Sequence, residues 1–335
     1  MRSLRLFSVL LLVLVIGGSW GFLVHRTTTQ LAVYQLPVPM QSFFHENMDY
    51  LVRYSVRPDQ RRNGDPTEGS KHYIDLEAFE KNEGGKLLPE QWSDAIKMFP
   101  EDSLKKYGHV PYWVVTMKER LTEAFRSGNR DSILFYAADL AHYIEDAHVP
   151  LHTSLNHDGQ LTGQKGMHSL WESMVPEIEL ANYNLFEEHK ATYIGNPAKT
   201  IWASVRKAHT LVPDLFAAEK EVSQSFTDST KYRIQIRNGR ESRSYSTAFA
   251  RAYAQRLGNT INEQLLRSAH LVTDFWYTCW ADAGKPDLAP LLKAPLTAEQ
   301  RFAFEKELQS FKRNSLLQDK LLRAREEKKT VAAED

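Results

Sequence analysis

The stretch HYIEDAHVPLH, residues 142–152, decides how this chain is interpreted, because it combines a helical pattern with a forced helix end. On a helix, His142 and Asp146 are four residues apart and project from one face. Pro150 cannot continue a helix and drives Val149 toward extended backbone, so His152 leaves in a new direction. Two side chains on the helix and one just beyond its end can therefore converge on one point.

A second pair with the same spacing follows a glycine-punctuated loop, with His168 and Glu172 in HSLWE. Imidazole and carboxylate groups are ordinary zinc ligands, and two of them four residues apart on a helix can share one ion. One such pair alone is more often a surface ion pair. Two pairs with His152 inside 31 residues favour a metal site. Thiolate ligands are absent from it, which is typical of catalytic rather than structural zinc.

The remaining chain predicts an all-α fold in a single multi-helix domain. Apolar residues recur at spacings of three and four, and alternating β-branched runs are scarce. Prolines and glycines mark loops at 57–69 and 153–166. The pattern predicts helices at 27–35, 39–56, 110–127, 129–147, 168–174, 196–222 and 246–282.

The two ends of the sequence differ from the middle. Residues 1–19, MRSLRLFSVLLLVLVIGGS, have the layout of a cleaved signal peptide, which predicts an exported protein, periplasmic or secreted. The alternative is an uncleaved membrane anchor, but the apolar run from Leu6 to Ile16 is shorter than the roughly 20 residues that span a bilayer. We therefore expect a helical domain at 20–290, and a charged helical tail at 291–335 that is a solvated appendage. No transmembrane span is expected in the mature form.

The overall charge is balanced, with 42 Lys plus Arg and 42 Asp plus Glu. The net charge therefore does not attract the protein to nucleic acid or to an anionic membrane. A polyanionic substrate would have to be bound by local groups, such as metal ions or a few arginines. Cys279 is the single cysteine, so an internal disulfide is excluded and an exported form relies on its core or on metal.

The pattern H-x3-D-x5-H followed by H-x3-E resembles the metal core of the superfamily that joins bacterial zinc-dependent phospholipase C with fungal single-strand-specific nucleases. The resemblance implies an all-α exported phosphodiesterase with three zinc ions, one of them bound by the amino terminus of a mature N-terminal tryptophan. Removal of residues 1–19 would make Trp20 the first residue, with His25 five positions on. The remaining family ligands correspond to Asp59 in RPDQRR and His72 in SKHYID.

Carried over by position, the resemblance implies three ligand sets. The first zinc would be held by Asp59, His72, His142 and Asp146; the second by His152, His168 and Glu172; and the third by Trp20, His25 and the other oxygen of Asp146. Zinc ions roughly 3.5–4 Å apart would supply hydroxide at neutral pH for in-line attack on phosphorus. Asp59 and Arg62 are the predicted catalytic residues, since Arg62 matches an arginine of the nuclease branch that would bind phosphate oxygens.

The resemblance implies a phosphodiester substrate, either single-stranded nucleic acid or phospholipid. Tyr73 and Asp75 stand where the nucleases stack on a base and read its edge, although the phospholipases also have an aromatic and an acid there. The choline-selective phospholipases have an acid and two aromatic residues at three positions that are Leu23, Gln60 and Gly69 in this chain. A quaternary ammonium group would therefore lack its binding cage here.

Two features favour the phospholipase branch instead. Glu172 is the residue that the phospholipases have at a position where the nucleases have aspartate, and the disulfides of the nucleases cannot form in a chain with one cysteine. The leading hypothesis is a nuclease-like enzyme, and zinc-dependent phospholipase C is the alternative. A third hypothesis is a secreted helical protein that uses zinc only for folding or docking. No stable protein partner is implied.

Overall fold

The computed structural model describes residues 21–80, 88–237 and 240–328; the predicted signal peptide and Trp20 lie outside them. The structure is 66% helical with two short strands, which confirms the all-α prediction. The chain forms the helices α1 (Phe22–Tyr34), α2 (Val38–Glu46), α3 (Met48–Tyr54), α4 (Arg57–Arg61), α5 (Glu77–Glu80), α6 (Trp92–Met98), α7 (Glu101–Lys106), α8 (Val110–Ser127), α9 (Arg130–Asp146), α10 (Met167–Ser169), α11 (Val175–Glu179), α12 (Pro197–His209), α13 (Val212–Ser223), α14 (Asp228–Lys231), α15 (Thr247–Leu257), α16 (Thr260–Asp282) and α17 (Ala298–Lys312).

Shorter segments complete the described chain. They are the 3-10 turns η1 (Gly69–Lys71), η2 (Pro150–Thr153), η4 (Leu180–Asn182), η5 (Ala289–Leu291) and η6 (Arg323–Lys328), the π-helical turn η3 (Leu170–Met174), and the antiparallel strands β1 (Tyr232–Arg237) and β2 (Arg240–Tyr245). The sequence pattern did not predict this hairpin or the small helices α6 and α7.

Three predicted helices are each two helices in the structure. The segment 39–56 breaks at Asn47, whose backbone leaves the helical region and whose side chain donates to the Phe43 carbonyl. The segment 246–282 breaks at Gly258, with φ of 59°. The segment 196–222 breaks before Pro213, which lies in the first turn of α13 as proline geometry allows. Likewise, the predicted loop 57–69 begins with the short helix α4, because Pro58 also lies in a first turn.

The antiparallel pair α8 and α9 forms where it was predicted, and its turn has a local cause. Gly128 ends α8 in the left-handed conformation, with φ of 63°. Asn129 then caps α9, since its side chain accepts a hydrogen bond of 2.9 Å from the Ser132 amide. The cap fixes where α9 starts and therefore which of its faces meets the core.

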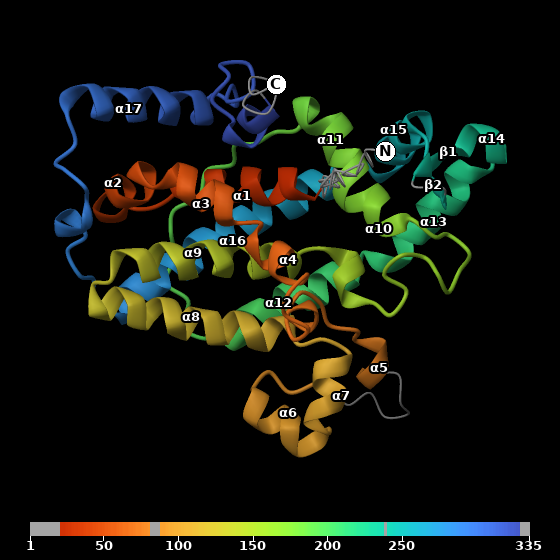
Figure 1. Cartoon of the computed structure of the whole chain (residues 1–335), viewed down its shortest axis with the longest axis horizontal. Helices are drawn as coiled ribbons and strands as arrows, with labels where there is room; N and C mark the ends of the chain where they lie inside the picture. Colours follow the sequence, from red (N-terminus) through yellow and green to blue (C-terminus); the bar gives the residue numbers. More distant parts are fainter. Residues whose placement is uncertain (1–20, 81–87, 238–239, 329–335) are drawn as a thin grey trace, which may run out of the picture.

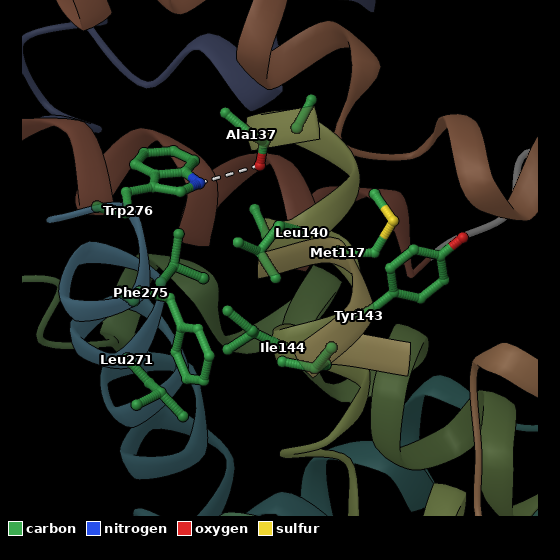
Figure 2. Packing of buried hydrophobic residues seen from close by; sticks show 14 of the residues in the cluster. Met117, Ala137, Leu140, Tyr143, Ile144, Leu271, Phe275 and Trp276 are labelled. Carbon is green, nitrogen blue, oxygen red and sulfur yellow. Dashed lines mark hydrogen bonds between the residues drawn. The ribbon is translucent and has the colours of Figure 1, made fainter. Parts of the chain in front are cut away.

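The core surrounds α9, which packs against α8, α16, α1 and α3 (Figure 1). On one face of α9, Ala137, Leu140 and Ile144 meet α16, and the Trp276 indole donates a 3.0 Å hydrogen bond to the Ala137 carbonyl (Figure 2). Full burial of such a side chain stabilises the fold by about 1.5–3 kcal/mol. This packing holds the C-terminal turn of α9, with His142 and Asp146, inside the protein.

A second apolar cluster lies beside this core and carries η2, α10 and the hairpin. Leu151 and Met167 are fully buried in it, and Tyr245 at the end of β2 packs on Phe249 of α15. This cluster fixes the segments on both sides of the loop 153–166.

The C-terminal tail is not the solvated appendage that its charge suggested. Helix α17 is largely exposed, but Phe311, Leu316 and Leu322 are buried in the main core. The Gln30 amide group of α1 donates to the Leu321 carbonyl at 2.8 Å. Sparse apolar residues in a charged stretch therefore anchor the tail, while the proposed domain boundary at 290 stays a prediction. Among the described helices, none combines the length and apolar character needed to span a bilayer.

Candidate metal centre

The first group of candidate ligands joins α9 to the segment after η1. The Asp146 Oδ2 atom lies 2.8 Å from His72 Nδ1 and 3.2 Å from His142 Nε2, and the two imidazole nitrogens are 3.0 Å apart. All three side chains are buried. Local helix geometry brings His142 and Asp146 together, whereas His72 comes from a distant segment.

Backbone hydrogen bonds place His72 beside the C-terminal end of α9. The Ile74 amide donates to the His152 carbonyl at 2.8 Å, and the Leu76 amide donates to the Thr153 carbonyl at 3.2 Å. On the other side, the Tyr73 carbonyl accepts from the Val110 amide at 3.1 Å. The segment 72–76 is thus held between η2 and the start of α8, which fixes the direction of the His72 ring.

The second oxygen of Asp146 faces another set of histidines. Asp146 Oδ1 is 3.3 Å from His152 Nδ1 and 3.7 Å from His25 Nε2. The carboxylate therefore turns one oxygen to His72 and His142 and the other to His152 and His25. A carboxylate in this position can bridge two cations, which a single imidazole nitrogen cannot do.

His152, His168 and Glu172 form the second group. The Nε2 atoms of the two histidines are 3.0 Å apart, and Glu172 Oε2 lies 2.5 Å from His168 and 3.5 Å from His152. Glu172 belongs to the π-helical turn η3, which continues directly from α10. The His168 side chain is 37% exposed, so this group reaches the surface.

His25 on α1 also lies against the first group. Its ring stacks on the His142 ring with centroids 4.2 Å apart. Its Nδ1 atom lies 2.5 Å from Glu145 Oε2, and Thr29 donates to the other Glu145 oxygen at 3.1 Å. Glu145 thus occupies the Nδ1 side of the ring and leaves Nε2 directed at Asp146.

Asp59 and Arg62 lie at the outer edge of the first group. Asp59 Oδ1 is 3.6 Å from His72 Nδ1 and 3.9 Å from His142 Nε2. The Arg62 side chain is 50% exposed, with Nη1 3.5 Å from Asp59 Oδ1. Arg61 points elsewhere, since it bonds Asp139 at 2.8 Å. Of the two neighbouring arginines, Arg62 is therefore the one directed at the candidate ligands.

The predicted substrate residues Tyr73 and Asp75 lie one and three residues after His72 in the chain. The Tyr73 hydroxyl donates to the Lys106 carbonyl at 3.1 Å. Burial, and secondarily the nearby Glu77 charge, raise the pKa of Asp75 to about 6. Both residues belong to the segment 72–76 that carries His72, and their contact with a substrate stays a prediction.

The first described residue, Gly21, lies against the second group. A Cβ atom built on Gly21 would be 2.6 Å from Glu172 Oε1, so a larger residue here would displace the carboxylate. Trp20, the predicted amino-terminal ligand, lies outside the described residues.

Burial and mutual charge control the protonation of the cluster. Burial would raise the pKa of Asp146, but His142 and His152 together hold it well below the ordinary value. Burial lowers the pKa of His25, yet Glu145 and Asp146 outweigh it and raise the pKa to about 10. Burial lowers the pKa of His142, which favours the neutral ring that a metal requires.

These donor sets fit a metal ion. His25, Asp59 and His142 form a third set; in each of the three, the ligand atoms lie within 4.8 Å of one another. Tetrahedral zinc with bonds of about 2.0–2.1 Å spaces its ligands roughly 3.3 Å apart, which is within the range observed here. The buried His152 Nδ1 atom makes no hydrogen bond within the described part of the chain, although it faces Asp146 Oδ1. A cation at this atom would supply its missing partner.

Comparison with known proteins identifies the family. Residues 20–270 match the S1/P1 nuclease family, a range that includes every predicted ligand. The chain belongs to the S1/P1 nuclease family. Members of this family are zinc-dependent phosphodiester hydrolases, so the superfamily predicted from the histidine and acid pattern is confirmed.

Comparison with individual proteins adds little to the S1/P1 nuclease assignment. No curated protein matches the chain. Among solved structures, the alpha-toxin of Clostridium perfringens from an avian strain has 13% identity and a TM-score of 0.45, with 81% of this chain and 65% of that chain covered. The chain thus spans slightly less than two thirds of that toxin.

Two carboxylates around the candidate metal centre were missed by the sequence reasoning. Glu68 is buried, accepts hydrogen bonds from Arg61, Lys71 and Tyr143, and lies 3.6 Å from His72 Nε2. Its spacing of four from His72 was a usable signal. Glu145 carried no such signal, because its partner His25 is 120 residues away.

Proposed function

We propose that this chain is an exported zinc-dependent phosphodiesterase that cleaves single-stranded nucleic acid. The observation that carries the proposal is the orientation of Asp146, whose two oxygens face His72 with His142 on one side and His152 with His25 on the other. A shared ionised carboxylate of this kind suits neighbouring zinc ions, and the family is zinc-dependent.

The proposed centre holds three zinc ions. The ligands would be Asp59, His72, His142 and Asp146 for the first ion, His152, His168 and Glu172 for the second, and Trp20, His25 and Asp146 for the third. Bound zinc would supply Lewis acidity and an activated water for phosphodiester hydrolysis. The third ion depends on cleavage of residues 1–19, because an amine is a good ligand and a peptide nitrogen is not.

The chain itself would position the phosphodiester at this centre. Arg62 is half exposed beside Asp59, so its guanidinium can turn toward two phosphate oxygens without leaving a buried partner unpaired. Tyr73 would stack on a base and Asp75 would accept a hydrogen bond from its edge. The family match favours this nucleic acid substrate.

Phospholipase C activity is a second candidate, and Glu172 supports it. This position holds glutamate, which is the choice of the phospholipase branch, and its carboxylate contacts both His152 and His168. The positions 23, 60 and 69, however, lack the acid and aromatic side chains that would surround a quaternary ammonium.

One assay series separates the candidates. The mature protein starting at Trp20, loaded with zinc, is given single-stranded DNA and phosphatidylcholine vesicles, each with and without a chelator. Chelator-sensitive cleavage of DNA alone supports the nuclease, and release of phosphocholine alone would replace it by the phospholipase. Zinc-dependent folding without turnover of either substrate would instead indicate a structural metal protein.

A further inference from the structure

A cleft of about 520 Å³ lies between α12 and α16, outside the candidate metal ligands. Its rim carries three exposed cationic side chains, Lys199 and Lys207 from α12 and Arg267 from α16. Within the lining that the structure describes there is no Phe, Tyr or Trp side chain. The cleft is therefore suited to an anion rather than to a stacked base.

The positive charge of this cleft is only partly neutralised by neighbouring acids. Lys199 and Lys207 form no ion pair with any residue in the described ranges, and Arg267 has a 3.5 Å contact with Glu263, one helical turn away. Asp274 is the acidic residue of the lining, and its Oδ1 atom already accepts from His189 Nε2 at 2.8 Å and from the Thr192 amide at 2.7 Å. In a chain with no net charge, this is a local excess of cations.

The spacing of the lysines matches an extended ligand. Lys199, Ala203 and Lys207 are four residues apart and follow one face of α12, so the two lysines are about 12 Å apart along the helix axis. The small Ala203 between them leaves the cleft open, and Arg267 faces them from α16. Cations at both ends and across the cleft can contact successive phosphates of one strand.

The inner end of the cleft adjoins the metal centre. His148, two residues after Asp146, is buried there, and its carbonyl accepts a 2.6 Å hydrogen bond from Gln264. His148 and Gln264 line this cleft and also a small cavity that contains His25 and Glu172. The two sites therefore share a wall.

We propose that Lys199, Lys207 and Arg267 form an accessory site for the phosphate backbone of a single-stranded nucleic acid. This inference rests on the proposed nuclease function. The site would hold strand beyond the nucleotides at the zinc ions, so it would favour long substrates over short ones. Because contacts to phosphate oxygens do not depend on the base, it would bind without base preference.

The test compares two triple variants with equal loss of charge in the zinc-loaded mature protein. The cleft variant is Lys199→Gln, Lys207→Gln and Arg267→Gln. The control variant is Lys220→Gln, Arg251→Gln and Lys306→Gln, which changes exposed residues outside the cleft. The oligonucleotides carry phosphorothioate linkages to slow cleavage, and thermal unfolding checks that both variants fold.

Binding of a fluorescent oligothymidylate dodecanucleotide and of a dinucleotide is measured by anisotropy over a range of salt concentrations. With about 0.7 counterions released per single-strand phosphate contact, loss of three contacts should lower the slope of log K against log salt by about 2. The cleft variant should bind the dodecanucleotide roughly tenfold or more weakly at about 50 mM salt, and the dinucleotide unchanged. The control variant should stay within about twofold.

Equal dodecanucleotide binding by the cleft and control variants would overturn the accessory site. The accessory site would also be overturned if millimolar inorganic phosphate displaced the oligonucleotide and the protein showed no preference for the longer strand. That result would indicate a site for free phosphate. Wild-type protein is assayed in parallel for chelator-sensitive DNA cleavage. Absence of that cleavage would refute the nuclease function and this site together, whereas normal cleavage with equal binding refutes the accessory site alone.

Discussion

Replacing Glu145 by alanine should weaken the zinc site that includes His25 without removing any predicted ligand. Glu145 Oε2 lies 2.5 Å from His25 Nδ1, and both side chains are at most 4% exposed. Alanine would leave the ring N–H buried and unpaired, a loss of about 1–3 kcal/mol. Since 1.4 kcal/mol is a factor of ten, this predicts roughly 5- to 150-fold weaker binding of one zinc ion, consistent with the effect of outer carboxylates elsewhere.

The assay is competition for zinc between the mature protein and a chromophoric chelator, with metal content measured after dialysis. Glu145→Gln keeps an acceptor for the His25 ring and should lose less affinity than Glu145→Ala. Glu123→Ala is the control, because this glutamate is an exposed α8 residue that pairs with Arg126. Unchanged affinity for every zinc ion in Glu145→Ala, or equal losses in the alanine and glutamine variants, would refute the argument that Glu145 orients His25.

Other changes test other parts of the structure. Gly21→Ala should displace the Glu172 carboxylate, because its Cβ would lie 2.6 Å from Oε1, and should lower zinc content by about one ion per chain; full occupancy would contradict this. Burial raises the pKa of Asp75 to about 6, so its ionised carboxylate destabilises the fold. The stability that the protonated group contributes below the ordinary pKa of an aspartate is therefore lost as the pH rises through 6. Asp75→Asn should therefore raise Tm more at pH 8 than at pH 5, and equal gains would exclude the shift. Trp276→Phe removes the bond to the Ala137 carbonyl and part of a fully buried side chain, and should lower the free energy of unfolding in urea by about 1–3 kcal/mol at constant zinc. A one-residue extension before Trp20 should reduce zinc content and phosphodiesterase activity, and an unimpaired extended protein would remove the amino terminus from the site.

The all-α class and the longest helices could be predicted because their signals are local. Gly128 and Asn129 mark the α8–α9 turn, and both helices occur where periodicity places them. The division of longer segments was missed because the breaks at Asn47 and Gly258 interrupt the chain without interrupting the apolar pattern. The tail was misjudged because three buried apolar side chains, among many charged ones, determine its packing.

By itself, the sequence determined the ligand pairs whose members are four residues apart, since helix geometry alone places His142 beside Asp146 and His168 beside Glu172. It also determined the family, because the order of the ligands along the chain can be read from the sequence alone. Tertiary structure decided which oxygen of Asp146 faces which histidine, that Glu145 holds His25, and that cations from α12 and α16 face one cleft. These contacts join residues far apart in the chain, so they depend on how buried side chains pack whole helices together, and that packing has no local sequence signature.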